Sequence, residues 1–161
     1  MGNDSAVDVW EPLQFLLGTW SGTCSGKPGD GRVERTCAFV LNERFIQVTG
    51  RSTFEPQEKN PDGEIHEELG FWSYDQIRDV HVYREFLAEG FVNQFVLESS
   101  DPAKLVLVTE AIENLPPGWQ ARTTFEILGP DHIRESFELR KPDTEWDCYI
   151  TTELRRVSEG D

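Results

Sequence analysis

Turn-forming residues divide this 161-residue chain into short, evenly spaced segments, and this spacing constrains its fold more than any other feature. Residues that preset φ or tolerate positive φ recur at 27–31, 60–63, 89–90, 100–102, 115–118, 129–131 and 141–143. The runs between them are rich in Val, Ile, Thr, Phe and Trp, which favour strands. The pattern predicts about ten strands, at roughly 18–26, 32–41, 44–54, 65–74, 80–88, 91–99, 104–112, 119–128, 132–140 and 146–156.

Apolar and polar residues alternate most regularly in the last third of the chain. Trp119, Ala121, Thr123 and Phe125 share one face of a strand, and charged residues such as Arg122 lie on the other. One buried face and one solvent-facing face for each strand are typical of antiparallel pairing. The only helical pattern is a short entry segment, Trp10 to Leu17, in which Pro12 suits a first turn and Gly18 an end.

These elements predict an all-β fold: a ten-stranded antiparallel up-and-down barrel, lipocalin- or fatty-acid-binding-protein-like, with a short N-terminal helix. The domain should span 1–161, with the barrel at about 18–156. A two-layer sandwich is the main competing architecture. Because barrel diameter grows with strand number, ten strands should leave an internal cavity for one small molecule.

Composition excludes some classes of partner. The chain carries 15 basic and 30 acidic side chains, so its formal net charge is −15. Nucleic acids and anionic membranes both require a basic surface, so neither is expected as a partner. Residues 1–6 show no signal peptide and no myristoylation pattern. We expect a cytoplasmic monomer or homodimer.

The three cysteines are Cys24, Cys37 and Cys148, and they form no CxxC motif. Cys24 and Cys37 lie at similar distances from the 28–31 turn, so a hairpin could place them opposite each other. The sequence leaves open a disulfide between them, but reduced buried thiols are favoured in a cytosolic protein.

Two segments resemble the nitrobindin family. Gly18-Thr19-Trp20-Ser21-Gly22-Thr23-Cys24 is similar to that family's GxWxGxG opening, and His66-Glu67-Glu68-Leu69-Gly70-Phe71 to its H-x-E-x-G-aromatic segment. The resemblance implies a compact ten-stranded barrel, similar to fatty-acid-binding proteins. Several nitrobindins hold ferric heme at the barrel mouth and are credited with nitric oxide binding and peroxynitrite isomerisation.

The chain departs from that family at several positions. Cys24 replaces the last glycine of the first motif, and the family's Pro-Thr-Ile stretch has no counterpart between Gly26 and Phe39. The family's heme-ligating histidine lies near the chain end, but no histidine follows His132, and the equivalent position falls on or near Tyr149. Alternation places Tyr149 on the solvent-facing side, so ordinary heme b ligation is not expected.

Few residues suggest specific chemistry. His66 shares a strand face with Trp72 and could be a polar contact on the cavity wall or an exposed strand histidine. His81 could form a metal site with His66, although no third ligand has a recognisable spacing. Trp20 is either a ligand contact or, more in keeping with its position beside the entry segment, a plug at the barrel base.

Parity along the strands adds further candidates. Arg84 and Glu135 fall in step with apolar residues, so an inward Arg84 could bind a ligand carboxylate. The competing explanation is a strand-edge position near the barrel rim. Phe137 is a candidate wall residue, whereas the Glu67-Glu68 pair is expected on a solvated face. No nucleophile elbow, triad or phosphate loop is present.

The leading hypothesis is a noncatalytic protein that binds a small hydrophobic molecule in the barrel lumen. The enzymatic alternative is heme-based chemistry of the peroxynitrite isomerase type. A third hypothesis is an interaction module, in which side chains fill the lumen and leave no room for a ligand. The predicted ligand contacts are His66, Trp72, Trp20, Arg84, Phe137 and Tyr149.

Overall fold

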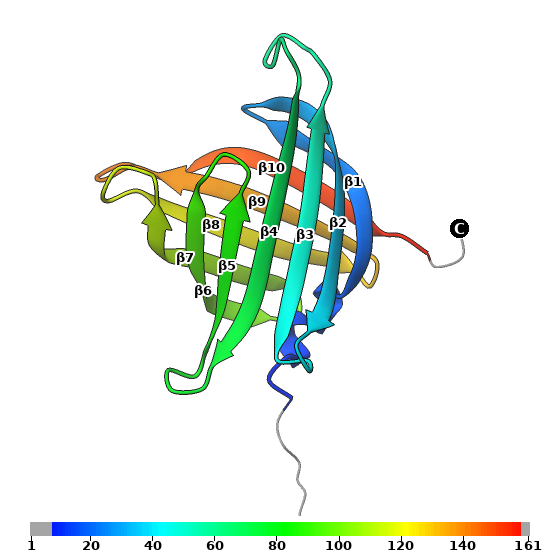
Figure 1. Ribbon diagram of the computed structural model, residues 1–161, viewed down its shortest axis with the longest axis vertical. Coiled ribbons are helices and arrows are strands. Elements are labelled where there is room, and N and C mark those ends of the chain that lie inside the picture. The colour runs from blue at the N-terminus through cyan, green and yellow to red at the C-terminus, as the bar shows by residue number, and fades with distance from the viewer. Residues whose placement is uncertain (1–7, 159–161) are drawn as a thin grey trace, which may run out of the picture.

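The computed structural model describes residues 8–158 and confirms the predicted barrel (Figure 1). Each strand pairs antiparallel with the next along the chain, and β1 pairs with β10 to close the sheet. A competing sandwich is thereby excluded. The elements are the 3₁₀ segment η1 (Glu11–Leu16) and the strands β1 (Gly18–Gly26), β2 (Gly29–Val40), β3 (Phe45–Phe54), β4 (Glu64–Asp75), β5 (Val80–Leu87), β6 (Val92–Asp101), β7 (Lys104–Glu113), β8 (Gln120–Gly129), β9 (His132–Arg140) and β10 (Asp147–Arg156).

The entry segment forms a plug at one end of the barrel, which we call the closed end (Figure 1). The expected helix over Trp10–Leu17 is a 3₁₀ segment, with Pro12 in its first turn and with Leu13 and Leu16 buried. Trp20 Nε1 donates to the Leu16 carbonyl at 2.9 Å. The segment stays short because β1 begins at once with Gly18, whose φ of +117° suits only glycine.

Small residues allow the strands to approach closely at the seam where the barrel closes. A Cβ on Gly22 would lie 1.8 Å from the carbonyl oxygen of Glu153 in β10, so any side chain there would push the two strands apart. This explains the glycines that accompany Trp20 along β1.

Cys24 and Cys37 do not face each other, so of the two states that the sequence left open the structure shows the favoured one, free buried thiols. Cys24 faces Gly31 across the β1–β2 hairpin, and Cys37 faces Gly18. The hairpin turns at residues 27–28, because Gly26 already pairs with Gly29, so the two cysteines are out of step. Both are free and buried.

The described part of the chain contains no helix long and apolar enough to cross a membrane. The expectations about the first six residues lie outside the described range.

Candidate functional site

A cavity of about 400 Å³ opens at the barrel end opposite η1, which we call the open end. Its upper wall is an apolar band contributed by several strands and by the loop between β5 and β6. The side chains of this band include Phe54, Leu87, Phe91, Phe137 and Leu139. The lumen is therefore not filled by side chains at this end.

The floor of the cavity carries a buried cluster of charged groups. Arg35 on β2 projects inward between Val33 and Cys37, and its Nη2 lies 2.6 Å from Glu135 Oε1 and 3.6 Å from Glu68 Oε1. The Arg35 side chain is only 10% exposed, and its Nε has no hydrogen-bond partner. The Glu135 oxygen also lacks a well-oriented hydrogen bond, so the contact with Arg35 is chiefly electrostatic.

A third carboxyl group completes this floor cluster, which we define as Arg35, Glu68, Glu85 and Glu135. Glu85 on β5 is 8% exposed and accepts a hydrogen bond from Asn93 Nδ2 at 3.0 Å. Burial, reinforced by the negative charge of Glu68, raises the pKa of Glu85 to about 8. Burial likewise raises the pKa of Glu68, although Arg35 opposes the shift.

Aromatic rings pack directly beneath the floor cluster. Trp72 stacks on Tyr83 with ring centroids 4.9 Å apart, and Tyr83 stacks in turn on Phe95. Gly70 makes room for this layer, because a Cβ there would lie 2.2 Å from the Tyr83 hydroxyl oxygen. Trp72 therefore supports the floor and, like Trp20 in the closed end, does not line the main cavity.

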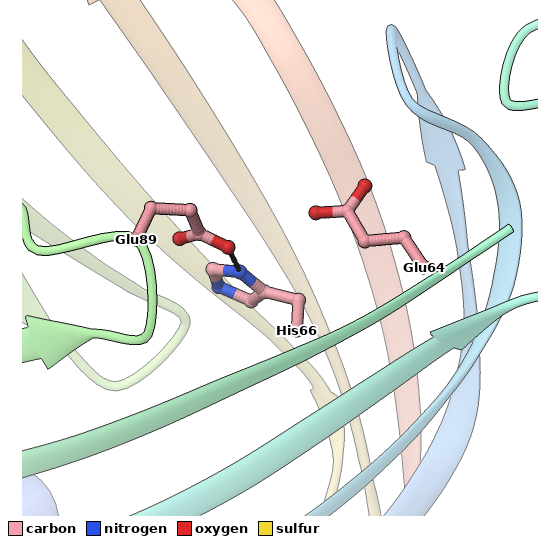
Figure 2. A group of neighbouring side chains, drawn as sticks. All are labelled: Glu64, His66 and Glu89. Atoms are coloured by element: carbon pink, nitrogen blue, oxygen red, sulfur yellow. Dashed lines mark hydrogen bonds and ion pairs between the residues drawn. The ribbon is translucent and has the colours of Figure 1, made fainter. Parts of the chain in front are cut away.

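A second polar group, the rim cluster, lies at the mouth of the cavity and comprises Glu64, His66 and Glu89 (Figure 2). Glu64 and His66 project from β4, and Glu89 reaches toward them from the loop after β5. His66 Nδ1 lies 2.7 Å from Glu89 Oε2, and one ligand atom from each of the three side chains lies within 4.8 Å of the others. This spacing would suit a divalent cation held by one nitrogen and two carboxylate oxygens.

Of the two positions that the sequence left open for His66, the structure shows the one on the cavity wall, and the suggested pairing with His81 is wrong. His81 lies on the closed-end half of β5, where its Nε2 is 2.6 Å from the Val9 carbonyl oxygen and its ring packs near Trp10. The two histidines fall at opposite ends of the barrel because β4 and β5 pair Tyr74, not His66, with His81.

Tyr149 lines the cavity, contrary to the solvent-facing position predicted by alternation. A register shift between Cys148 and Ile150 interrupts the alternation in β10 and turns Tyr149 toward the mouth. Its ring meets that of Phe137 edge to face, with centroids 6.2 Å apart. Burial, together with the negative charges of Glu64 and Glu89, raises the pKa of the Tyr149 phenol.

The predicted inward position of Arg84 is wrong. Arg84 lies on the outer surface, where its Nε donates to Gln94 Oε1 at 3.0 Å. Alternation along the strand gave the wrong face for Arg84 because β5 has apolar residues on both faces. Tyr83 and Glu85 face the lumen, and Arg84 does not. Glu135, selected by the same rule, does face the lumen.

Sequence reasoning missed Arg35 and placed Glu68 on a solvated face. Both share a strand face with buried apolar residues, Arg35 with Val33 and Cys37, and Glu68 with Trp72. The alternation of inward and outward residues along β2 and β4 could have identified both. It does so only when it is applied to every strand and the side that faces the lumen is known.

Comparisons with known proteins support the fold. No family model matches the chain, and no curated protein matches it. The chain is similar to the crystal structure of Rv2717c from M. tuberculosis, with a TM-score of 0.70, 19% sequence identity, and coverage of 96% of this chain and 100% of that one. It also matches the structure of EF1p2_mFAP2b bound to DFHBI, with a TM-score of 0.49, 12% identity, and coverage of 93% and 100%. The second likeness is too low to carry an argument, and the first shows the barrel fold alone.

Proposed function

We propose that this protein binds a small, mainly apolar molecule in the lumen of the barrel, without catalysing a reaction on it. The observation that carries the proposal is the cavity of about 400 Å³ at the open end. This volume lies within the range of about 300–1,000 Å³ that is typical of small-molecule sites. A protein whose barrel served only as an interaction module would have no need of this space.

The distribution of side chains around the cavity supports the same proposal. An apolar band provides most of the wall, and polar groups are confined to the floor and the rim. Apolar walls with a few placed polar groups are the usual design of sites that orient a small ligand. Among the residues selected from the sequence, His66, Phe137 and Tyr149 lie on this lining and remain predicted contacts.

Heme b, the cofactor that the family resemblance suggests, fits the site poorly. Tyr149 would have to ligate ferric iron as a tyrosinate. Burial and the charges of Glu64 and Glu89 raise its pKa, which disfavours that form. The same two carboxyl groups would repel heme propionates at the mouth. We therefore derive no heme chemistry from this site.

A cavity-filling variant tests the proposal. Thr152 lies at floor level on the inner face of β10, and its neighbour Thr151 lies on the outer face. Thr152→Phe should abolish saturable binding of the neutral fluorescent probe N-phenyl-1-naphthylamine, whereas Thr151→Phe should leave it unchanged. Native mass spectrometry of freshly purified protein should show a bound apolar compound in the wild type and not in Thr152→Phe. Probe binding that both variants retain equally would contradict a lumen site.

Hemin titration tests the alternative. We expect no sharp Soret band in wild-type protein and no difference between wild type and Tyr149→Phe. A band that disappears in Tyr149→Phe would show ligated heme and overturn the preference for an apolar ligand.

A further inference from the structure

We propose that the ligand carries a basic nitrogen, and that its protonated amine sits on the floor cluster beneath an apolar body. This inference rests on the proposed lumen site and specifies the chemical class of its ligand. Its basis is the imbalance on the floor, where three carboxyl groups lie in one cluster with a single guanidinium group and two of them contact it.

The carboxyl groups of the floor outnumber the cation that they share. Arg35 contacts Glu135 and, at a longer distance, Glu68, whereas Glu85 accepts a hydrogen bond from the neutral amide of Asn93 and interacts with the carboxyl group of Glu68, and no cation among the described residues contacts it. A buried carboxylate without a cation is costly, so the group either takes up a proton or acquires a positive partner. A ligand ammonium group would provide that partner together with three hydrogen-bond donors.

The floor cluster presents an unpartnered acceptor at the cavity. Glu135 Oε1 is a buried acceptor without a well-oriented hydrogen bond, on a residue that lines the cavity. The Arg35 Nε–H, also unpartnered, is a donor and does not bear on an ammonium ligand. Buried polar atoms of folded proteins nearly always find partners, so this acceptor is open to a donor supplied by a ligand.

The signs of the charges argue against an anionic ligand such as a fatty acid. An inward arginine could bind a fatty-acid carboxylate, but Arg35 already faces Glu135 at 2.6 Å. A carboxylate entering the cavity would also pass Glu64 and Glu89 at the rim. Among the described lining residues, Arg35 and His66 are the only basic side chains against five glutamates. The cavity therefore favours a cation over an anion along its whole depth.

Three probes with the same chain and different head groups test the inference: decylamine, decanol and decanoate. Binding is measured by calorimetry at pH 8. The amine is charged at this pH, because the pKa of an alkylammonium group is about 10.4, like that of lysine. We expect decylamine to bind with one-to-one stoichiometry and about tenfold or more tighter than either other probe, the gain expected for a charge-assisted contact in a buried site.

Isosteric variants assign the effect to the floor cluster. The double variant Glu68→Gln/Glu85→Gln should weaken decylamine binding about tenfold and should not weaken decanol binding. Glu67→Gln removes a charge from the outer face of β4, beside Glu68, and should change neither affinity. This control separates binding in the lumen from attraction of an amine to the acidic surface. Circular dichroism verifies folding, which loss of a buried charge should not impair.

Proton release gives a second, independent measurement. The groups that face Glu85 are Glu68 on β4, Arg35 on β2, Glu135 on β9 and Asn93 on β6, besides Tyr83 on its own strand. An incoming cation favours ionised Glu85, so decylamine binding should release protons near neutral pH and its affinity should rise toward pH 8. Calorimetry in two buffers of different ionisation enthalpy measures the release, which should shrink in Glu85→Gln.

The outcomes distinguish failure of the amine inference from failure of the lumen site. If all three probes bind equally and Thr152→Phe blocks them, the lumen site stands and the amine inference is wrong. If decanoate binds tightest, the inference is also wrong, and Arg35 recognises anions despite its partners. If no probe binds saturably, the lumen site itself is contradicted.

Discussion

The closed end and the cavity floor each hold an arginine, half-buried Arg156 and buried Arg35, and the two arginines differ in their partners. At the closed end, Arg156 lies 4.3 Å over the Trp20 ring and donates to the carbonyl oxygens of Leu17 and Phe15 and to Asp131. At the cavity floor, Arg35 contacts two carboxyl groups, those of Glu135 and Glu68, and its Nε has no partner. The first arrangement is saturated, whereas the second retains unused capacity.

This difference separates polar groups that build the fold from polar groups that are available to a ligand. The Arg156 contacts tie η1 to the last strand and complete the plug, so adding a ligand there would remove a bond that already exists. The floor cluster carries excess negative charge beside open space, so a ligand could improve it. A buried polar network with unmade hydrogen bonds lowers the stability of the fold. Such a network is therefore expected where function requires it.

Removing the plug should have the largest effect on stability. Trp20 is 1% exposed, and Trp20→Ala should lower the free energy of unfolding by about 3–5 kcal/mol, because it leaves a cavity and an unbonded Leu16 carbonyl. Urea denaturation measures the loss. Trp146→Ala is the matched control at the open end, where Arg122 and Arg140 cover a partly exposed ring, and it should cost about 1 kcal/mol. Equal losses at the two ends would contradict the plug.

Breaking the floor cluster should have the next largest effect. Arg35→Met leaves Glu135 and Glu68 buried without a cation and should cost about 3 kcal/mol at neutral pH, with a smaller cost in acid as the carboxyl groups take up protons. Arg84→Met, on the outer face, should change stability by less than about 0.5 kcal/mol. The double variant Arg35→Met/Glu135→Met should recover part of the loss. Failure to recover any would show that Arg35 acts through packing and not through charge.

The pH dependence of stability should reveal Glu85. Its pKa rises from 4.5 to about 8 on folding, so the folded protein holds a proton that the unfolded chain releases. The free energy of unfolding should therefore fall as pH rises from about 4.5 to about 8 and then level off. Asp75, Glu110 and Glu153, whose pKa values are lowered by hydrogen bonds from arginines, contribute in the opposite direction. The measured quantity is therefore the difference between wild type and Glu85→Gln. Parallel curves for the two proteins would contradict a buried, protonated Glu85.

The fold could be predicted from the sequence because its signals are local. Turn residues and alternation placed all ten strands to within a few residues, and Pro12 and Gly18 bounded the entry segment. Errors arose where the strand register differs from simple alternation. The bulge at Cys148 reversed the predicted side of Tyr149. The position of the turn, at residues 27–28, separated Cys24 from Cys37. A bulge inserts one residue and leaves no mark in composition.

The site could be predicted only in part, because its members come from different strands. His66, Phe137 and Tyr149 lie on the lining, as does Glu135, which parity singled out. The sequence around Arg35 and Glu68 is that of ordinary charged strand residues. Only closure of the barrel brings the two together with Glu85 and Glu135. Sequence parity gives the face of each residue, but the height at which four strands align depends on the stagger of the whole barrel.

The rim cluster should contribute least to stability, although His66 is the residue that the sequence emphasised most. The His66–Glu89 pair is partly solvated, with side chains 26% and 39% exposed, and a pair of this kind is worth about 0.2–1 kcal/mol. His66→Asn should therefore lower the free energy of unfolding by no more than that amount, and Glu89→Gln should match it. The comparison with Arg35→Met is the informative one, because both variants remove one partner of an ion pair in the same cavity and differ in depth. A rim loss as large as the floor loss would mean that solvent does not reach the mouth as the structure indicates, and the contrast between a solvated rim and a buried floor would then fail.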